Sequence, residues 1–104
     1  MSVYLIATIE VKASLFGPFT EAMGTLQAIV EGAGWKLASA YVLRTGQLNT
    51  VIDIWELDDH NHMTAGFAAV GTDPRAAGIA TVLGEAVIKE TITFADAITF
   101  PKPA

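Results

Sequence analysis

The fold is decided by residues 35–57, WKLASAYVLRTGQLNTVIDIWEL, in which two runs rich in β-branched and aromatic residues flank a short glycine-containing segment. We expect strands over 35–44 and 48–57 with a turn at 45–47, because such a connection is typical of an antiparallel hairpin. The second strand carries large apolar side chains on both faces. This pattern indicates that both faces of the strand are covered.

The residues on either side of this hairpin predict two more strands and three helical segments. Residues 3–11 alternate as a strand whose two faces are both partly apolar. Apolar residues recur at helical spacing in three further stretches, each next to glycine or proline residues that begin or end helices. The expected elements are a strand at 3–11, a helix that starts near 19 and is ended by the glycines at 32 and 34, a short helix through 63–70, another through 76–87, and a strand at 89–100.

The resulting order, β-α-β-β-α-α-β, predicts an α+β protein with the ferredoxin-like arrangement, a four-stranded antiparallel sheet with helices on one face. We interpret residues 1–100 as a single domain and residues 101–104 as a C-terminal tail. The helices can cover only one face of the sheet. We therefore expect a homodimer in which two sheets pack face to face as a dimeric α/β barrel, with a cavity between them.

The composition excludes several classes of protein. The net charge is −5 and the six basic residues are scattered, so we expect no nucleic-acid partner. There is no cysteine to form disulfides or thiolate metal sites. The N-terminus has no positively charged leader and no apolar stretch is long enough for a membrane span, so we expect a cytoplasmic protein with no membrane partner. The mean hydropathy of +0.45 then indicates apolar interiors and interfaces.

Two carboxylates are candidates for acid–base chemistry. Asp53 shares a strand face with Val51 and Trp55, where loss of hydration would raise its pKa and make it a general base for a carbon acid. The alternatives are that it pairs with Arg44 across the hairpin or lies at the wet end of the barrel. Asp96 shares a face with apolar residues of the last strand. If the two carboxylates were close, they would share a proton.

Aromatic and amide side chains are the candidates for a ligand pocket. Tyr41 is a candidate catalytic residue, because its phenol can donate to a substrate carbonyl. Tyr4, Asn49 and Trp55 are candidate pocket residues. The aromatic residues can equally pack in the core or at an interface, with no contact to a ligand. The side chain of Asn49 can equally bond the local backbone.

His60 and His62 lie two residues apart at a junction between strand and helix. The segment around them is rich in possible metal ligands, and a histidine can also bind haem iron. The same composition is typical of an exposed helix N-terminus. We predict no metal site and no cofactor, and the haem interpretation remains an alternative.

The segment at residues 45–58, TGQLNTVIDIWELD, resembles the NIPSNAP family of the dimeric α/β-barrel superfamily. The resemblance extends over about 35–75. The first strand lacks an arginine that family members often carry there, and Asp53 stands where many have a histidine. The matching residues are Gly46, Leu48, Asn49, Val51, Ile54 and Trp55.

This resemblance implies a fold and a dimer. The wider superfamily includes cofactor-free monooxygenases, cyclases, isomerases and some haem proteins. We expect a domain that binds a small apolar or aromatic molecule in the dimer cavity, with Asp53, Tyr41 and Asp96 as catalytic groups if it is a cofactor-independent enzyme of one of these types. The alternatives are a non-enzymatic dimeric interaction module and a haem-handling protein.

Overall fold

The computed structural model describes residues 2–103. No helix in this part of the chain is both long and apolar enough to cross a membrane. The elements are β1 (Val3–Val11), a 3-10 turn η1 (Ala13–Leu15), α1 (Phe16–Gly32), β2 (Lys36–Val42), β3 (Thr50–Leu57), α2 (Asn61–Thr72), α3 (Ala76–Ala86) and β4 (Val87–Ala95).

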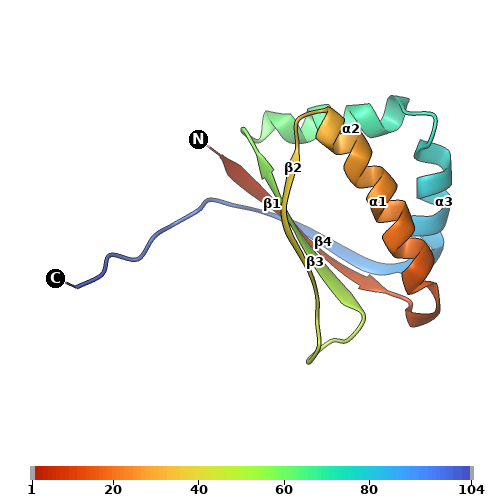
Figure 1. Ribbon diagram of the computed structural model, residues 1–104, viewed down its shortest axis with the longest axis horizontal. Helices are drawn as coiled ribbons and strands as arrows, with labels where there is room; N and C mark the ends of the chain where they lie inside the picture. The colour runs from red at the N-terminus through yellow and green to blue at the C-terminus, as the bar shows by residue number, and fades with distance from the viewer. Residues whose placement is uncertain (1, 104) are drawn as a thin grey trace.

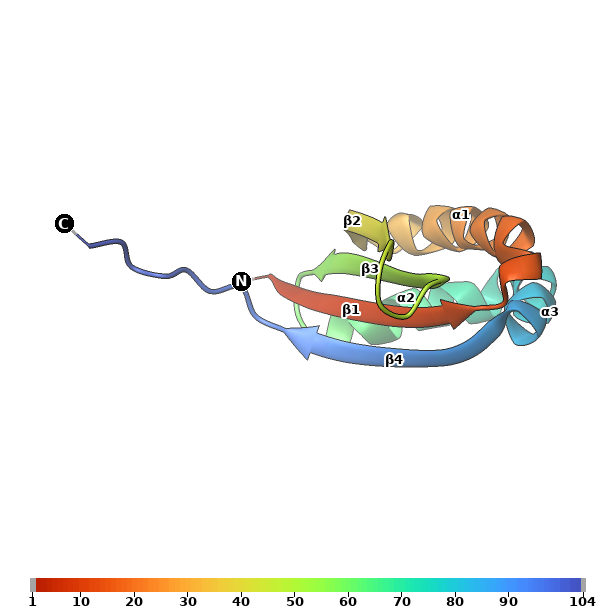
Figure 2. The same ribbon diagram turned by 90° about the horizontal axis from the view of Figure 1, so that it is seen from below.

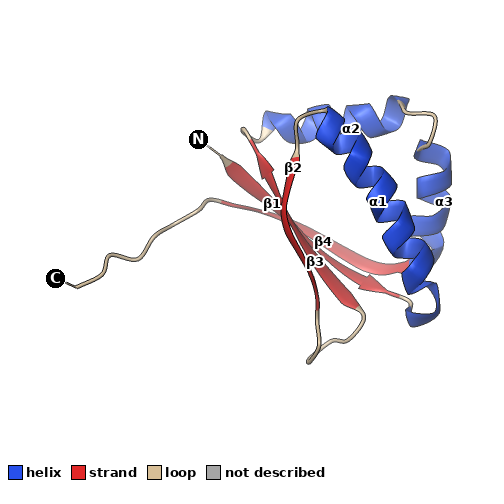
Figure 3. Cartoon of the chain, in the orientation of Figure 1, coloured by secondary structure: helices blue, strands red, loops and turns tan. Residues whose placement is uncertain are grey.

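The four strands form one antiparallel sheet in the order β2-β3-β1-β4. The three helices lie together on one face of this sheet, as Figures 1 and 2 show. Coloured by secondary structure, the molecule separates into a sheet layer and a helix layer (Figure 3). This is the ferredoxin-like α+β arrangement that the order of the elements predicts.

The sheet has a helix-facing side and an open side, and the strand alternation decides which residues lie on each. In β1, every second residue from Val3 to Val11 is buried against the helices. In β3, Asp53, Trp55 and Leu57 are buried on the same side. α1 contributes Phe19 and Val30 to this core, along with other apolar residues.

The open side of the sheet carries no helix. Its central residues, Ile6 of β1 with Ile52 and Ile54 of β3, are half-buried within the single chain. The prediction that these strands are apolar on both faces is therefore correct. The helices of the chain cover only one of the two faces.

The structure corrects three of the expected boundaries. The first helix begins at Phe16 and not near 19, so Pro18 lies within its first turn, where a proline is tolerated. The connection between β2 and β3 runs over 43–49 and is longer than a tight turn. It places Gly46 at φ 77° and Asn49 at φ 58°, in the left-handed region. The last strand ends at Ala95 and does not continue to 100, because Ala95 pairs with Tyr4 near the start of β1 and little of β1 remains beyond it. Residues 96–103 project away from the sheet (Figures 1 and 2).

Candidate functional site

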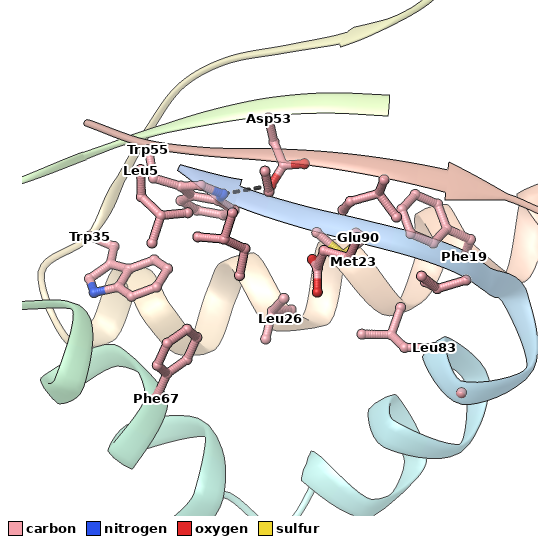
Figure 4. Close-up of a pocket in the computed structure, with 15 residues that line it drawn as sticks. Leu5, Phe19, Met23, Leu26, Trp35, Asp53, Trp55, Phe67, Leu83 and Glu90 are labelled. Atoms are coloured by element: carbon pink, nitrogen blue, oxygen red, sulfur yellow. Dashed lines mark hydrogen bonds between the residues drawn. The ribbon is translucent and has the colours of Figure 1, made fainter. Parts of the chain in front are cut away.

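A cavity of about 390 Å³ lies between the sheet and the three helices of the single chain. It falls within the usual size range of small-molecule sites, and its walls are mainly apolar. We expected a cavity between two sheets; this one lies on the helix-facing side of one sheet. The described residues that line it are Leu5, Ala7, Ile9, Phe19, Met23, Leu26, Trp35, Asp53, Trp55, Phe67, Leu83, Gly84, Val87, Glu90 and Ile92 (Figure 4).

Asp53 is the most buried polar group of this cavity, with 4% of its surface exposed. The indole Nε1–H of Trp55 donates a hydrogen bond of 2.6 Å to its Oδ2 (Figure 4). Its other oxygen, Oδ1, is buried and has no hydrogen-bond partner within residues 2–103. A buried polar atom without a partner is costly, so Oδ1 keeps an unused capacity to accept a hydrogen bond.

Burial raises the pKa of Asp53, because loss of hydration disfavours the charged carboxylate. The hydrogen bond from Trp55 partly offsets this effect on the pKa, and the nearby charge of Glu90 adds to it. The sequence prediction of a desolvated carboxylate with a raised pKa is therefore confirmed. The alternative pairing with Arg44 is wrong, because the partner of the carboxylate is Trp55 and Arg44 lies exposed in the 43–49 loop.

Glu90 is the second carboxylate of the cavity, and the sequence analysis missed it. It lies on β4 opposite Ile9 of β1, and Ile9 in turn pairs with Val51 of β3. Glu90 therefore lies on the helix-facing side, like Asp53, with only β1 between their strands. It retains exposure at the cavity mouth, and the partial burial of its carboxyl raises its pKa. The sequence does contain a signal for this residue. Glu90 lies two residues before Ile92, on the same apolar face of the last strand that drew attention to Asp96.

Three aromatic rings form one end of the cavity. The ring of Trp35 contacts Trp55 and Phe67 edge to face, with centroids 5.7 Å and 5.6 Å away. The indole Nε1–H of Trp35 donates to the carbonyl oxygen of His62 at 2.8 Å. Both indole N–H groups of the cavity wall are thus already engaged, one by His62 and one by Asp53.

The structure separates the other predicted site residues from Asp53. Tyr41 pairs with Ile52 and lies on the open side of the sheet, 57% exposed, and Tyr4 also lies on that side. Neither phenol faces the cavity, because strand alternation places them on the opposite side from Asp53. The prediction that Tyr41 and Asp53 act in one pocket is therefore wrong.

Asp96 and Asn49 are also outside the cavity. Asp96 follows the end of β4 and is exposed, so it cannot share a proton with Asp53. Asn49 is exposed in the loop before β3, where its backbone oxygen accepts a hydrogen bond of 2.9 Å from the N–H of Val11. This contact uses the main chain of Asn49, not the side-chain bond to the local backbone that the sequence suggested. Trp55 is the one predicted pocket residue, besides Asp53, that lines the cavity.

The two histidines have local structural contacts. His62 Nε2 lies 2.7 Å from the carbonyl oxygen of Ala33, and its Nδ1 accepts the backbone N–H of Asp58 at 3.1 Å. Both ring nitrogens of His62 are therefore occupied, which leaves neither for iron. His60 is exposed and contacts the ring of Phe94 at 4.7 Å. Residues 2–103 contain no group of three or more histidine, aspartate or glutamate side chains placed to hold a metal ion.

Comparisons with known proteins show which solved structures share this fold. No protein-family model matches the sequence, and no curated protein matches it. The structure is similar to that of an uncharacterized NIPSNAP domain protein from Burkholderia xenovorans, with a TM-score of 0.78 and 18% identity over 97% of this chain and 99% of that one. It is also similar to a NIPSNAP family protein from Agrobacterium tumefaciens, with a TM-score of 0.81 and 13% identity over 96% of each chain.

A third similar structure is that of SnoaB, a cofactor-independent oxygenase from Streptomyces nogalater. Its TM-score is 0.66 at 15% identity, over 95% of each chain. The chain therefore has a ferredoxin-like fold shared by NIPSNAP proteins and by an oxygenase of this type. The resemblance found at residues 45–58 is confirmed at the level of the NIPSNAP fold.

Proposed function

We propose that this protein binds a small, largely apolar ring compound in the Asp53 cavity and that Asp53 acts there as a general base without a cofactor. The observation that carries the proposal is the unpartnered Oδ1 of Asp53, buried in an apolar cavity large enough for such a molecule. Oδ1 has no partner among the described residues and would accept the proton when a substrate atom reaches it, while Trp55 holds the other oxygen in place.

The environment of Asp53 suits proton abstraction from carbon. A carboxylate with a raised pKa is a stronger base than an ordinary one, and exclusion of water strengthens its action on a bound molecule. The proton would pass from an acidic C–H bond of the substrate to Oδ1, and the electron pair of that bond would remain on the substrate as an enolate. Return of a proton from Asp53 completes an exchange or isomerisation and needs no co-reactant.

The similarity to SnoaB supports this interpretation at the level of the fold, because that protein is a cofactor-independent oxygenase. The protein from Burkholderia xenovorans is uncharacterized, so it favours no reaction. The choice of proton transfer thus rests on the Asp53 site itself.

A carbon acid of suitable shape tests the proposal directly. We would incubate the protein with 2-tetralone, an apolar bicyclic ketone, in deuterated buffer and follow loss of the C1 protons by NMR. We expect exchange above the buffer rate, and about a hundredfold loss of that excess in Asp53→Asn, since general base catalysis is typically worth this much.

The matched control is Asp96→Asn, the same chemical change at an exposed carboxylate outside the cavity. It should leave the exchange rate unchanged. If the protein binds 2-tetralone but Asp53→Asn exchanges it as fast as the wild type, Asp53 is not the base. If 2-tetralone does not bind at all, the non-enzymatic interaction module becomes the better interpretation.

We also infer that a second copy of the chain covers the open side of the sheet. The support is the half-buried apolar centre formed by Ile6, Ile52 and Ile54, with Tyr41 more than half exposed beside it. A sheet face of this kind is costly to leave in water, and a second copy offers an identical apolar surface. The cavity lies on the other side of the sheet, so each protomer would keep its own site.

A further inference from the structure

The cavity wall has acceptors for hydrogen bonds but no free side-chain donor. Among the described lining residues, the side chains able to donate are the indoles of Trp35 and Trp55. Trp35 donates to the His62 carbonyl and Trp55 donates to Asp53. The side-chain polar groups of the wall that have no partner within residues 2–103 are the Oδ1 atom of Asp53 and the carboxyl group of Glu90, and both are acceptors. A ligand that also needs a donor from the wall would find none while these carboxyls are ionised.

The charges of the cavity have one sign. Asp53 and Glu90 are both acidic, and none of the six basic residues of the chain is among the described lining residues. Lys89, which neighbours Glu90 in β4, pairs with Glu10 of β1 and lies on the open side of the sheet. The chain as a whole carries a net charge of −5. An anionic ligand would be repelled here, and a cation attracted.

Glu90 lies at the mouth of the cavity, where it is the first charged residue that an entering ligand would meet. Phe67 and Ile92 line the same cavity, yet 49% and 44% of their surfaces are exposed, so the cavity opens beside the edge strand β4. Figure 4 shows Glu90 projecting from β4 toward the helices, while the carboxyl group of Asp53 lies close to the sheet beside Trp55. The two carboxyls thus differ in depth, with Asp53 buried and Glu90 at the mouth.

We propose that the cavity selects a ring compound that carries an ammonium group, and that Glu90 is the residue that recognises this group. This inference rests on the proposed function, whose substrate class it specifies. The ring would lie against Trp35, Trp55 and Phe67, and aromatic faces near a cation add further attraction. Asp53, deeper in the cavity, faces the reacting part of the molecule, and its charge adds to the preference for a cation.

Three compounds with one ring system test the selection: 2-aminoindane, 2-indanol and indane-2-carboxylate. Binding can be followed by tryptophan fluorescence, because both tryptophans of the chain line the cavity and these rings absorb little where indole is excited. We expect the amine to bind about tenfold more tightly than the carboxylate at pH 7, with the alcohol between them. Added salt should narrow this difference.

The variant Glu90→Gln should weaken binding of the amine about threefold, as for a partly exposed ion pair, and leave 2-indanol unchanged. Asp96→Asn also removes one negative charge, but it should leave the affinities for the amine and for 2-indanol unchanged. The inference is overturned if the carboxylate binds as tightly as the amine, or if Glu90→Gln leaves the preference intact.

The proposed function is tested separately by 2-indanol, whose hydroxyl can donate to Asp53. If 2-indanol binds and Asp53→Asn weakens it while no preference for the amine exists, the Asp53 site stands and the ammonium inference fails. If none of the three compounds changes tryptophan emission, this class of ring does not enter the cavity, and both proposals fail.

Discussion

Trp55 and Asp53 lie two positions apart on one face of β3, and the indole Nε1–H donates to Oδ2 at 2.6 Å. Alternation along a strand places residues i and i+2 side by side, so this bond needs no other element to form it. It holds one oxygen of the carboxyl and leaves the other free. The strand that supplies the base therefore also supplies the group that orients it.

Replacing Trp55 with Phe should raise the pKa of Asp53 further, because the hydrogen bond from Trp55 favours the ionised form. At pH 7 we expect a loss of about 1–3 kcal/mol in the free energy of unfolding, since a buried carboxylate loses its donor. Urea unfolding measures the stability, and carbon-13 NMR of labelled aspartate measures the pKa.

Trp35→Phe is the matched control for that change. It also removes an indole N–H, but the lost bond is to the His62 carbonyl and not to Asp53. Its effect on the pKa of Asp53 should therefore be small. If both variants shift the pKa equally, the shift reports altered packing of the aromatic rings and not the loss of the hydrogen bond.

The raised pKa of Asp53 gives stability a defined dependence on pH. The folded protein binds the Asp53 proton more tightly than the unfolded chain, whose carboxyl has its ordinary pKa of 3.8. This contribution is fully present below pH 3.8 and is lost as pH rises through the higher folded pKa. We expect Asp53→Asn to become more stable relative to the wild type as pH rises from 4 to 7.

Urea unfolding at several pH values checks this trend, with Asp96→Asn as the control that should run parallel to the wild type. Asp73 titrates in the opposite sense, because its hydrogen bonds from Arg75 lower its pKa to about 2. Its contribution begins to fall near its ordinary pKa of 3.8 and is lost as pH falls through about 2, and the wild type and both variants share it. A stability difference between Asp53→Asn and the wild type that is constant from pH 4 to 7 would contradict the assignment.

Much of the fold follows from local patterns in the sequence. Val3 to Val11 alternate as a strand, and the helix that starts at Phe16 has an apolar stripe that ends near Gly32. These features depend only on neighbours along the chain. The end of β4 was predicted wrongly because apolar alternation continues through Phe100, whereas strand pairing stops where β1 supplies no further partner beyond Tyr4.

The site was harder to predict than the fold, because it depends on which side of the sheet the helices cover. Asp53 was recognised from its own strand, where Trp55 shares its face. Tyr41 was assigned to the same pocket, but the register of β2 places it on the opposite side. Glu90 was missed because its closeness to Asp53 follows from the strand order β3-β1-β4, which no local pattern of residues specifies.

Gly66 shapes the aromatic end of the cavity. A Cβ atom at this position would overlap the indole of Trp35, whereas one at Gly71 of the same helix would meet nothing within 4 Å. We expect Gly66→Ala to displace the ring and cost about 1–3 kcal/mol of stability. Gly71→Ala should be neutral or slightly stabilising, because alanine favours helices.

Thermal or urea unfolding of the two glycine variants measures this difference. Gly66→Ala should also change tryptophan emission and weaken binding of 2-indanol, because Trp35 lines the cavity. Equal stabilities for both variants would show that Trp35 moves aside without cost. In that case the ring is not a fixed wall of the site.

The open side of the sheet and the helix-facing side should respond differently to a new charge. Trp55 is 3% exposed beneath the helices, so Trp55→Lys would remove a buried indole ring from the core and place a charge there, and it should unfold the chain. Ile54, the preceding residue, lies on the open side and is only half-buried. In a lone chain, a lysine at position 54 can extend into water, so Ile54→Lys should remain folded.

If a second copy covers the open side, Ile54→Lys should dissociate the dimer because two buried lysines would face each other across the interface. We expect the wild type to sediment at twice the chain mass of 11.0 kDa, and the variant to sediment as a folded monomer. Glu85→Lys, at an exposed position on α3, controls for added charge and should remain dimeric. A monomeric wild type would contradict the dimer. A dimer that survives Ile54→Lys would place the interface elsewhere, because an interface across the open side would have to bury that charge.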